Sequence, residues 1–205
     1  MDNPIIVGAQ FCSPLQVQLT VAKHIMDFNH GQLVISDSCG NALFKLYQTK
    51  VLLRELTVVQ DGDDCPVVSI QKKSISFHDT YQVYNKDTSE RLFSVKDKHM
   101  RDKASETFEI ELEDDLQPTF EVKGDFVRRN YKIIYRGSVV VAEVQQGHMS
   151  LYSEVTGKRK YGVVIPPKID QAFVAAVVII MEAIHNEGKE RSGNYRDSSD
   201  SDSDH

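Results

Sequence analysis

The run from Asp170 to Ile184 reads Asp-Gln-Ala-Phe-Val-Ala-Ala-Val-Val-Ile-Ile-Met-Glu-Ala-Ile, and its ten residues from Ala172 to Met181 are all apolar. A valine-rich run of this kind fits either a buried strand or a helix. No Pro or Gly occurs between Asp170 and residue 186, so the run is too long for an ordinary strand. Asp170 is a good helix N-cap and Gly188 suits a C-terminal stop, which together predict a helix over residues 169–187.

This predicted helix is apolar around its whole circumference, so it must be surrounded by other elements. Its uninterrupted apolar part would be about 15 Å long, against the ~30 Å that a bilayer core requires. Glu182 further disfavours a transmembrane span. The run is therefore expected to be a buried core helix, and its expected core residues are Phe173, Val174, Val177, Val178, Ile179, Ile180, Met181 and Ile184.

The chain before this helix shows short β segments separated by turns. The segments recur at roughly 8–12-residue intervals and number about a dozen, a spacing typical of a sandwich or a closed barrel. A helix with its side chains is ~10–12 Å across, and a barrel of about twelve strands is wide enough to hold one. The sequence therefore predicts a mainly β fold, a closed antiparallel barrel of about 12 strands around the buried C-terminal helix.

The two ends of the chain differ from this domain. Residues 1–13 form a polar lead-in, and residues 14–187 are assigned to the barrel with its central helix. Residues 188–205 are polar and end in alternating Ser and Asp, which predicts a disordered acidic tail. In this tail Ser199 and Ser201 each have an Asp three residues downstream, so both are candidate phosphorylation sites for an acid-directed kinase.

Composition excludes several classes of function. The net charge of −6 over 205 residues argues against direct nucleic-acid binding. Three cysteines without CxxC spacing, and no signal peptide, predict a reducing intracellular setting in the cytoplasm, at the plasma membrane or in the nucleus. The seven histidines show no zinc spacing, and no nucleophile, Walker or dinucleotide motif is present. We expect no catalytic residues, no cofactor and no metal site.

Four segments resemble the LURP-one-related proteins, a plant family with tubby-like C-terminal architecture. Three of them are Leu43-Phe44 after Gly40-Asn41, residues 76–84 (Ser-Phe-His-Asp-Thr-Tyr-Gln-Val-Tyr) and residues 120–124 (Phe-Glu-Val-Lys-Gly). The fourth and most specific is residues 161–170, Tyr-Gly-Val-Val-Ile-Pro-Pro-Lys-Ile-Asp, which runs into the apolar helix. Tyr81 departs from the family, where Trp is commoner at this position.

The resemblance implies a closed barrel of about twelve strands threaded by a hydrophobic helix, as in tubby proteins and phospholipid scramblases. Tubby domains bind phosphoinositides and tether transcription regulators to the plasma membrane, and the plant family is associated with pathogen defence. The resemblance brings no catalytic residues with it.

Two groups of basic residues are candidate sites for an anionic lipid headgroup. Lys72-Lys73 falls where the inward phases of two neighbouring β segments disagree, which predicts a turn or bulge at residues 71–74. Arg128-Arg129 and Lys132 follow Gly124-Asp125. Phosphate recognition needs converging cationic donors, and these residues supply them if the two turns meet at one end of the barrel. The alternative is that both are ordinary solvent-facing turns.

Three functions compete at this stage. The favoured one is a non-enzymatic, tubby-like module that binds a phosphoinositide-containing membrane surface. The second is a protein-interaction scaffold that recruits partners through its phosphorylatable acidic tail. The third, an enzyme or carrier that uses the barrel mouth, conflicts with a helix that fills the interior.

Overall fold

The computed structural model describes residues 4–26, 30–51, 54–73, 80–97, 107–113, 115, 117, 119–146 and 160–197. A short 3₁₀ helix and twelve strands precede one long helix. Their bounds are η1 Ala9–Phe11, β1 Val17–Met26, β2 His30–Ser36, β3 Ala42–Val51, β4 Arg54–Asp61, β5 Pro66–Lys73, β6 Thr80–Asn85, β7 Arg91–Asp97, β8 Thr107–Leu112, β9 Phe120–Asp125, β10 Asn130–Tyr135, β11 Val139–Gln145, β12 Lys160–Ile165 and α2 Gln171–Asp197.

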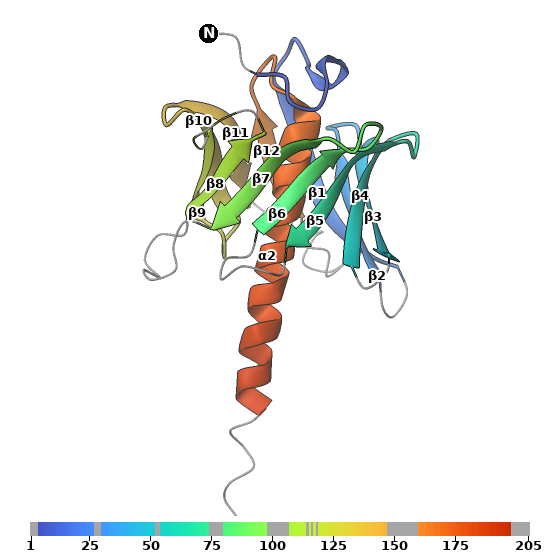
Figure 1. The fold of residues 1–205 in the computed structure, drawn as a ribbon, viewed down its shortest axis with the longest axis vertical. Helices are drawn as coiled ribbons and strands as arrows, with labels where there is room; N and C mark the ends of the chain where they lie inside the picture. The colour runs from blue at the N-terminus through green and yellow to red at the C-terminus, as the bar shows by residue number, and fades with distance from the viewer. Residues whose placement is uncertain are drawn as a thin grey trace, which may run out of the picture.

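The twelve strands form a closed antiparallel barrel around α2 (Figure 1). Each strand pairs with the next in sequence, and β1 pairs with β12 from Val17↔Ile165 to Ala22↔Lys160, which closes the ring. The expected fold class is thus confirmed. Closure leaves no sheet edge among these strands, so every strand has a hydrogen-bonded neighbour on both sides.

Alternation along the strands directs one set of side chains toward α2. These inward residues are fully buried on nearly every strand, as for Val59, Val83, Ile110 and Ile133. From the helix side, Phe173 meets two of them: its ring centroid lies 5.1 Å from that of Phe93 and 4.7 Å from that of Phe120. The predicted helix residues from Phe173 to Met181 are buried, and Ile184 is half-buried against the same core.

The two ends of the barrel differ in what covers them. At one end, here the cap end, the even-numbered strands finish and α2 begins. Asp170 caps the helix there, and its Oδ1 accepts the N–H groups of Ala172 and Phe173 at 3.1 Å each. At the other end, here the exit end, the odd-numbered strands finish. Figure 1 shows α2 running through the barrel and projecting from the exit end, with the N-terminus at the cap end.

The helix continues past the predicted stop. Gly188 lies inside α2, which ends at Asp197, so the assignment of residues 188–197 to a disordered tail was wrong. A single Gly inside a helix costs only about 1 kcal/mol relative to Ala, and the surrounding Glu, Lys and Arg residues are good helix formers. Within the described residues, no helix combines the length and hydropathy that a membrane span requires.

The turn expected at residues 71–74 is also displaced. Gln71, Lys72 and Lys73 belong to β5 and pair with Gln82, Tyr81 and Thr80 of β6. The phase argument relied on Ile75, which lies with residues 74–79 outside the described residues. Both lysines therefore lie in β5 at the exit end, and the register of the strand decides which face of the barrel wall each side chain is on.

Candidate functional site

Lys72 lies at the mouth of the exit end and points inward. It continues the inward face of Val68 and Ile70, because side chains two positions apart share a face. Its ammonium makes an ion pair with Oε2 of Glu187 on α2, and the hydroxyl of Tyr81 donates to Oε1 of the same carboxylate at 2.8 Å. The Lys72 Nζ also lies 5.6 Å from the centre of the Tyr81 ring. Glu187 is thus held by two donors from β5 and β6.

Arg129 is the second exit-end cation, and it is buried. Its Nε donates to Oε1 of Glu182 at 2.5 Å and its Nη2 donates to Oε2 at 3.1 Å, with both side chains 11% exposed. Its guanidinium also lies 5.4 Å from the centre of the Tyr161 ring. Burial opposes the charge on Arg129, but the hydrogen bonds and the charge of Glu182 outweigh burial and raise the pKa of Arg129.

Two tyrosines surround this ion pair. Burial raises the pKa of Tyr131 above its ordinary value, and the negative charge of Glu182 adds to the effect. Burial is likewise the main cause of the raised pKa of Tyr161, to which Tyr131 and Glu182 contribute. Both hydroxyls are therefore held in the neutral form beside the Arg129–Glu182 ion pair.

The hairpin of β9 and β10 carries the remaining predicted cations. Gly124 sits at φ +146°, and a Cβ there would come within 2.4 Å of the Asn130 carbonyl oxygen, so only glycine permits this close approach. The turn that follows is closed by the N–H of Arg129, which donates to the carbonyl oxygen of Phe126 at 3.2 Å. Arg129 adopts φ 51°, a left-handed conformation that its ion pair with α2 holds in place.

The outer face of this hairpin gathers positive charge around an apolar tip. Lys123 and Lys132 are direct cross-strand partners, and their side chains are 47% and 51% exposed. Val127 and Arg128, at the tip, are 72% and 82% exposed. Like charges directly opposite each other destabilise a sheet, and here neighbouring carboxylates offset the repulsion. We refer to Lys123, Val127, Arg128 and Lys132 as the hairpin cluster.

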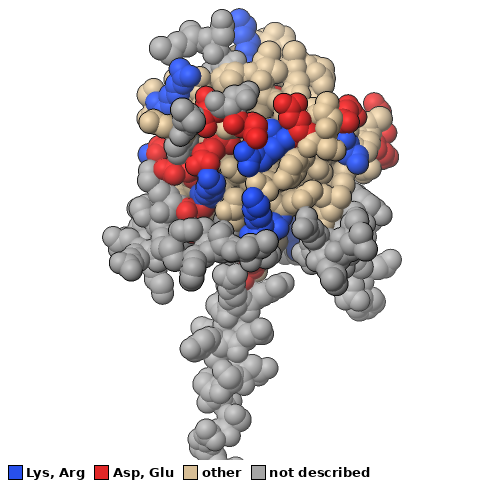
Figure 2. Space-filling view, viewed as in Figure 1, with Lys and Arg blue, Asp and Glu red and all other residues tan. Residues whose placement is uncertain are grey.

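Each cation of the hairpin cluster already has a carboxylate neighbour. Lys123 pairs with Glu121 at 2.5 Å and Lys132 with Glu143 at 2.8 Å, whereas Arg128 lies 3.7 Å from Asp125. Exposed ion pairs of this kind contribute only ~0–1 kcal/mol, so they leave the lysines available for exchange with a ligand. Figure 2 shows one face of the barrel, on which basic and acidic side chains are likewise interspersed.

The two predicted basic groups lie at the same end of the barrel but do not adjoin. Strands β6, β7 and β8 separate β5 from β9, which puts the groups roughly 19 Å apart around the wall at ~4.8 Å per strand. Helix α2 stands between them, with Glu187 facing one group and Glu182 the other. Lys73 is exposed, and among the described residues no carboxylate pairs with it.

The sequence prediction missed Lys123 and both glutamates of α2. Lys123 can be matched with Lys132 only when the register of the hairpin is known. Glu182 carried a usable signal, because a carboxylate that ends a fully buried apolar run requires a buried cationic partner.

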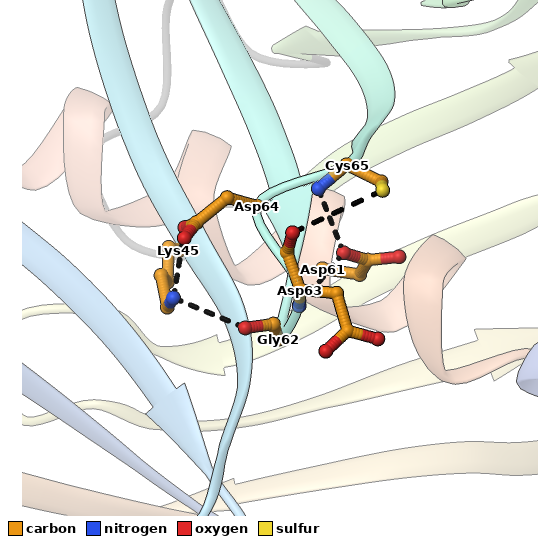
Figure 3. Close-up of polar contacts among 6 residues, drawn as sticks. All are labelled: Lys45, Asp61, Gly62, Asp63, Asp64 and Cys65. Atoms are coloured by element: carbon orange, nitrogen blue, oxygen red, sulfur yellow. Dashed lines mark hydrogen bonds and ion pairs between the residues drawn. The ribbon is translucent and has the colours of Figure 1, made fainter.

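An acidic turn, residues 61–65, joins β4 to β5 at the cap end, and the carboxylates of Asp61 and Asp64 make contacts within the protein (Figure 3). Oδ1 of Asp61 accepts the N–H groups of Asp63 and Cys65, at 3.0 and 2.9 Å. Lys45 donates to the Gly62 carbonyl oxygen at 3.1 Å and pairs with Asp64 at 2.8 Å. These contacts describe a solvated, self-bonded turn. The candidate phosphorylation sites Ser199 and Ser201 lie outside the described residues.

Comparison with known proteins assigns the family. The model of the family described as LURP-one-related matches residues 17–182, from the first strand to the buried end of α2. The chain belongs to the LURP-one-related family. The resemblance drawn from the four sequence segments is thus confirmed.

Relatives in this family match along almost the whole chain. Protein LURP-one-related 15 of Arabidopsis thaliana is 29% identical over 192 residues, which cover 90% of this chain and 88% of that protein. Protein LURP1 of Arabidopsis thaliana is 26% identical over 195 residues, covering 92% and 94%. The X-ray structure of Arabidopsis thaliana protein AT5G01750 is similar with a TM-score of 0.66 at 24% identity, over 89% of this chain and 99% of that one, and this likeness supports the fold.

Proposed function

We propose that this LURP-one-related protein is a non-enzymatic binding module that attaches to membranes containing phosphoinositides. The hairpin cluster carries the proposal. Three exposed cations on one hairpin, with Val127 at its tip, combine charge for headgroups with an apolar side chain for the bilayer interface. A Lys or Arg near an anionic membrane contributes about 1 kcal/mol, and the neighbouring carboxylates of Glu121, Asp125 and Glu143 reduce the sum for these three cations.

The fold favours a binding surface over a catalytic cavity. The interior that would hold a small molecule is filled by α2 and by the inward side chains of the strands. As the tubby-like resemblance implies, the function would be to tether a regulator at the plasma membrane, with further action in the cytoplasm or nucleus and a setting in plant pathogen defence.

Vesicle flotation tests the proposal. The full chain should float with phosphatidylcholine vesicles that contain a phosphoinositide at low salt, and should stay at the bottom with phosphatidylcholine alone. The variant K123A/R128A/K132A should lose most of this binding, and V127S should weaken it less. The matched control, K45A/K86A/R136A, removes three cations at the cap end and should float like the wild type. Equal flotation of both triple variants would contradict the assignment.

A protein-interaction scaffold is the second candidate. One observation favours it: α2 leaves the barrel and runs to Asp197, so the acidic tail begins away from the barrel wall (Figure 1). A chain ending at Glu187 keeps the buried part of the helix and lacks residues 188–205. Under the scaffold hypothesis it should lose protein partners in co-precipitation, whereas under the membrane hypothesis it should keep its vesicle binding.

A further inference from the structure

Two glutamates of α2 are bound at the exit end, but in different ways. Glu182 is buried, accepts two hydrogen bonds from one guanidinium and lies among aromatic rings. Glu187 lies farther along the helix and is one-third exposed, and Lys72 is one-quarter exposed. Removing one partner of a buried pair is strongly unfavourable, whereas a partly exposed pair contributes little. Of the two glutamates, Glu187 is therefore the one that another anion can displace from its partner.

The donors around Glu187 are fixed before any ligand arrives. Lys72 and Tyr81 are direct cross-strand partners in the β5–β6 ladder, and Tyr81 is only 4% exposed. One donates to each of the two carboxylate oxygens. Two donors held this way fit two oxygens of a phosphate monoester equally well.

We infer that Lys72 and Tyr81 form a phosphate-binding site that Glu187 of the chain's own helix occupies in the unliganded protein. A phosphate monoester, on a phosphoinositide headgroup or on a free inositol phosphate, displaces the carboxylate and pairs with Lys72 and Tyr81. Because Glu187 competes with the phosphate for these donors, the wild-type protein binds the phosphate more weakly than it would without Glu187. The membrane source of the ligand rests on the proposed function, whereas the site itself does not.

Removing the competitor tests the inference. Glu187→Gln keeps the shape of the side chain and removes its charge, so binding of soluble inositol trisphosphate by titration calorimetry should tighten about three- to fivefold, the factor that corresponds to a partly exposed ion pair. Asp64→Asn is the matched control: it removes one negative charge from the Lys45 pair at the cap end and should leave binding unchanged.

Two double variants test whether the gain in affinity comes from the Lys72–Tyr81 site or only from the lower negative charge of the protein. K72A/E187Q should lose the gain and bind more weakly than the wild type, and Y81F/E187Q should lose part of it. Equal affinity of E187Q and the wild type would overturn the inference, and so would a gain that survives K72A. Failure of E187Q to tighten on phosphoinositide vesicles while it tightens on inositol trisphosphate would keep the site and contradict its membrane source.

Thermal unfolding of each variant accompanies the titration. Glu187 lies beyond the buried part of α2, so E187Q should unfold within a few degrees of the wild type. If phosphoinositide vesicles bind no form of the protein, the proposed function fails, and the calorimetric arm still decides whether the phosphate site exists.

Discussion

Oδ2 of Asp170 accepts the backbone N–H of Val7 at 2.7 Å, although 163 residues separate the two in the chain. The N–H groups of Ile6 and Gly8 converge on the same oxygen at 3.1 and 3.0 Å. Three successive amides around one anion form a nest of the kind that usually holds phosphate or carboxylate ligands. One carboxylate thus caps α2 with Oδ1 and holds the N-terminal segment over the cap end with Oδ2.

Asp170→Ala should remove both functions together. We expect a loss of about 3 kcal/mol or more in the free energy of unfolding, because a helix cap and three charge-assisted hydrogen bonds are lost at a buried position. Urea denaturation measures the loss, and hydrogen exchange at residues 6–8 should become faster by orders of magnitude. Unchanged exchange at these amides would show that other contacts hold the segment.

Arg129→Ala should be strongly destabilising because it leaves the charge of Glu182 buried without a partner. The expected cost is about 3–5 kcal/mol in the free energy of unfolding, measured by denaturant titration. The double variant R129M/E182L removes both charges and should recover most of this loss. If the double variant were no more stable than R129A alone, the unpaired charge of Glu182 would not be the cause of the loss.

Phe173→Ala should cost about 3–5 kcal/mol, because the ring fills the space between Phe93 and Phe120 inside a closed wall that cannot collapse onto the cavity. Ile184→Ala, at a half-buried position on the same helix, serves as the comparison and should cost only about 1–2 kcal/mol. Denaturation midpoints of the two variants provide the measurement. Similar costs would mean that the helix is no better packed inside the barrel than at its mouth.

Stability should fall at alkaline pH because of Tyr131 and Tyr161. Their pKa values are raised in the folded protein, so the fold keeps protons that the unfolded chain releases above its ordinary pKa of about 10. The stabilisation is complete below that pH and is lost as the pH rises, by up to about 1.4 kcal/mol per tyrosine for each pH unit. Urea titrations across this range should show a shallower decline for Y131F/Y161F, and an equal decline would contradict the assignment.

The fold could be predicted because its main determinants are local. Ten successive apolar residues require a surrounding wall, and short alternating segments before them supply one. Asp170 was identified as the N-cap from its position alone. The stop at Gly188 was wrong because a lone glycine opposes a helix only weakly when no tertiary contact requires the chain to turn.

The candidate site was harder to predict because side-chain direction depends on register. Adjacent lysines in a strand face opposite ways, and only the pairing of β5 with β6 assigns Lys72 to the mouth and Lys73 to the outside. Arg128 and Arg129 separate in the same manner, one into solvent and one onto α2. Their functional roles therefore stay predictions, whereas their neighbours are now defined.

The order of the elements has a consequence for biosynthesis. A ribosome delivers all twelve strands before it delivers α2, and β1 must wait for β12 across most of the nascent chain. Until the helix arrives, the inward Val, Ile and Phe side chains have nothing to cover them, and long-range strand pairing is slow. A premature stop codon after Ile165 would thus release a chain with a complete set of strands that cannot mature, and that chaperones would have to hold or proteases remove.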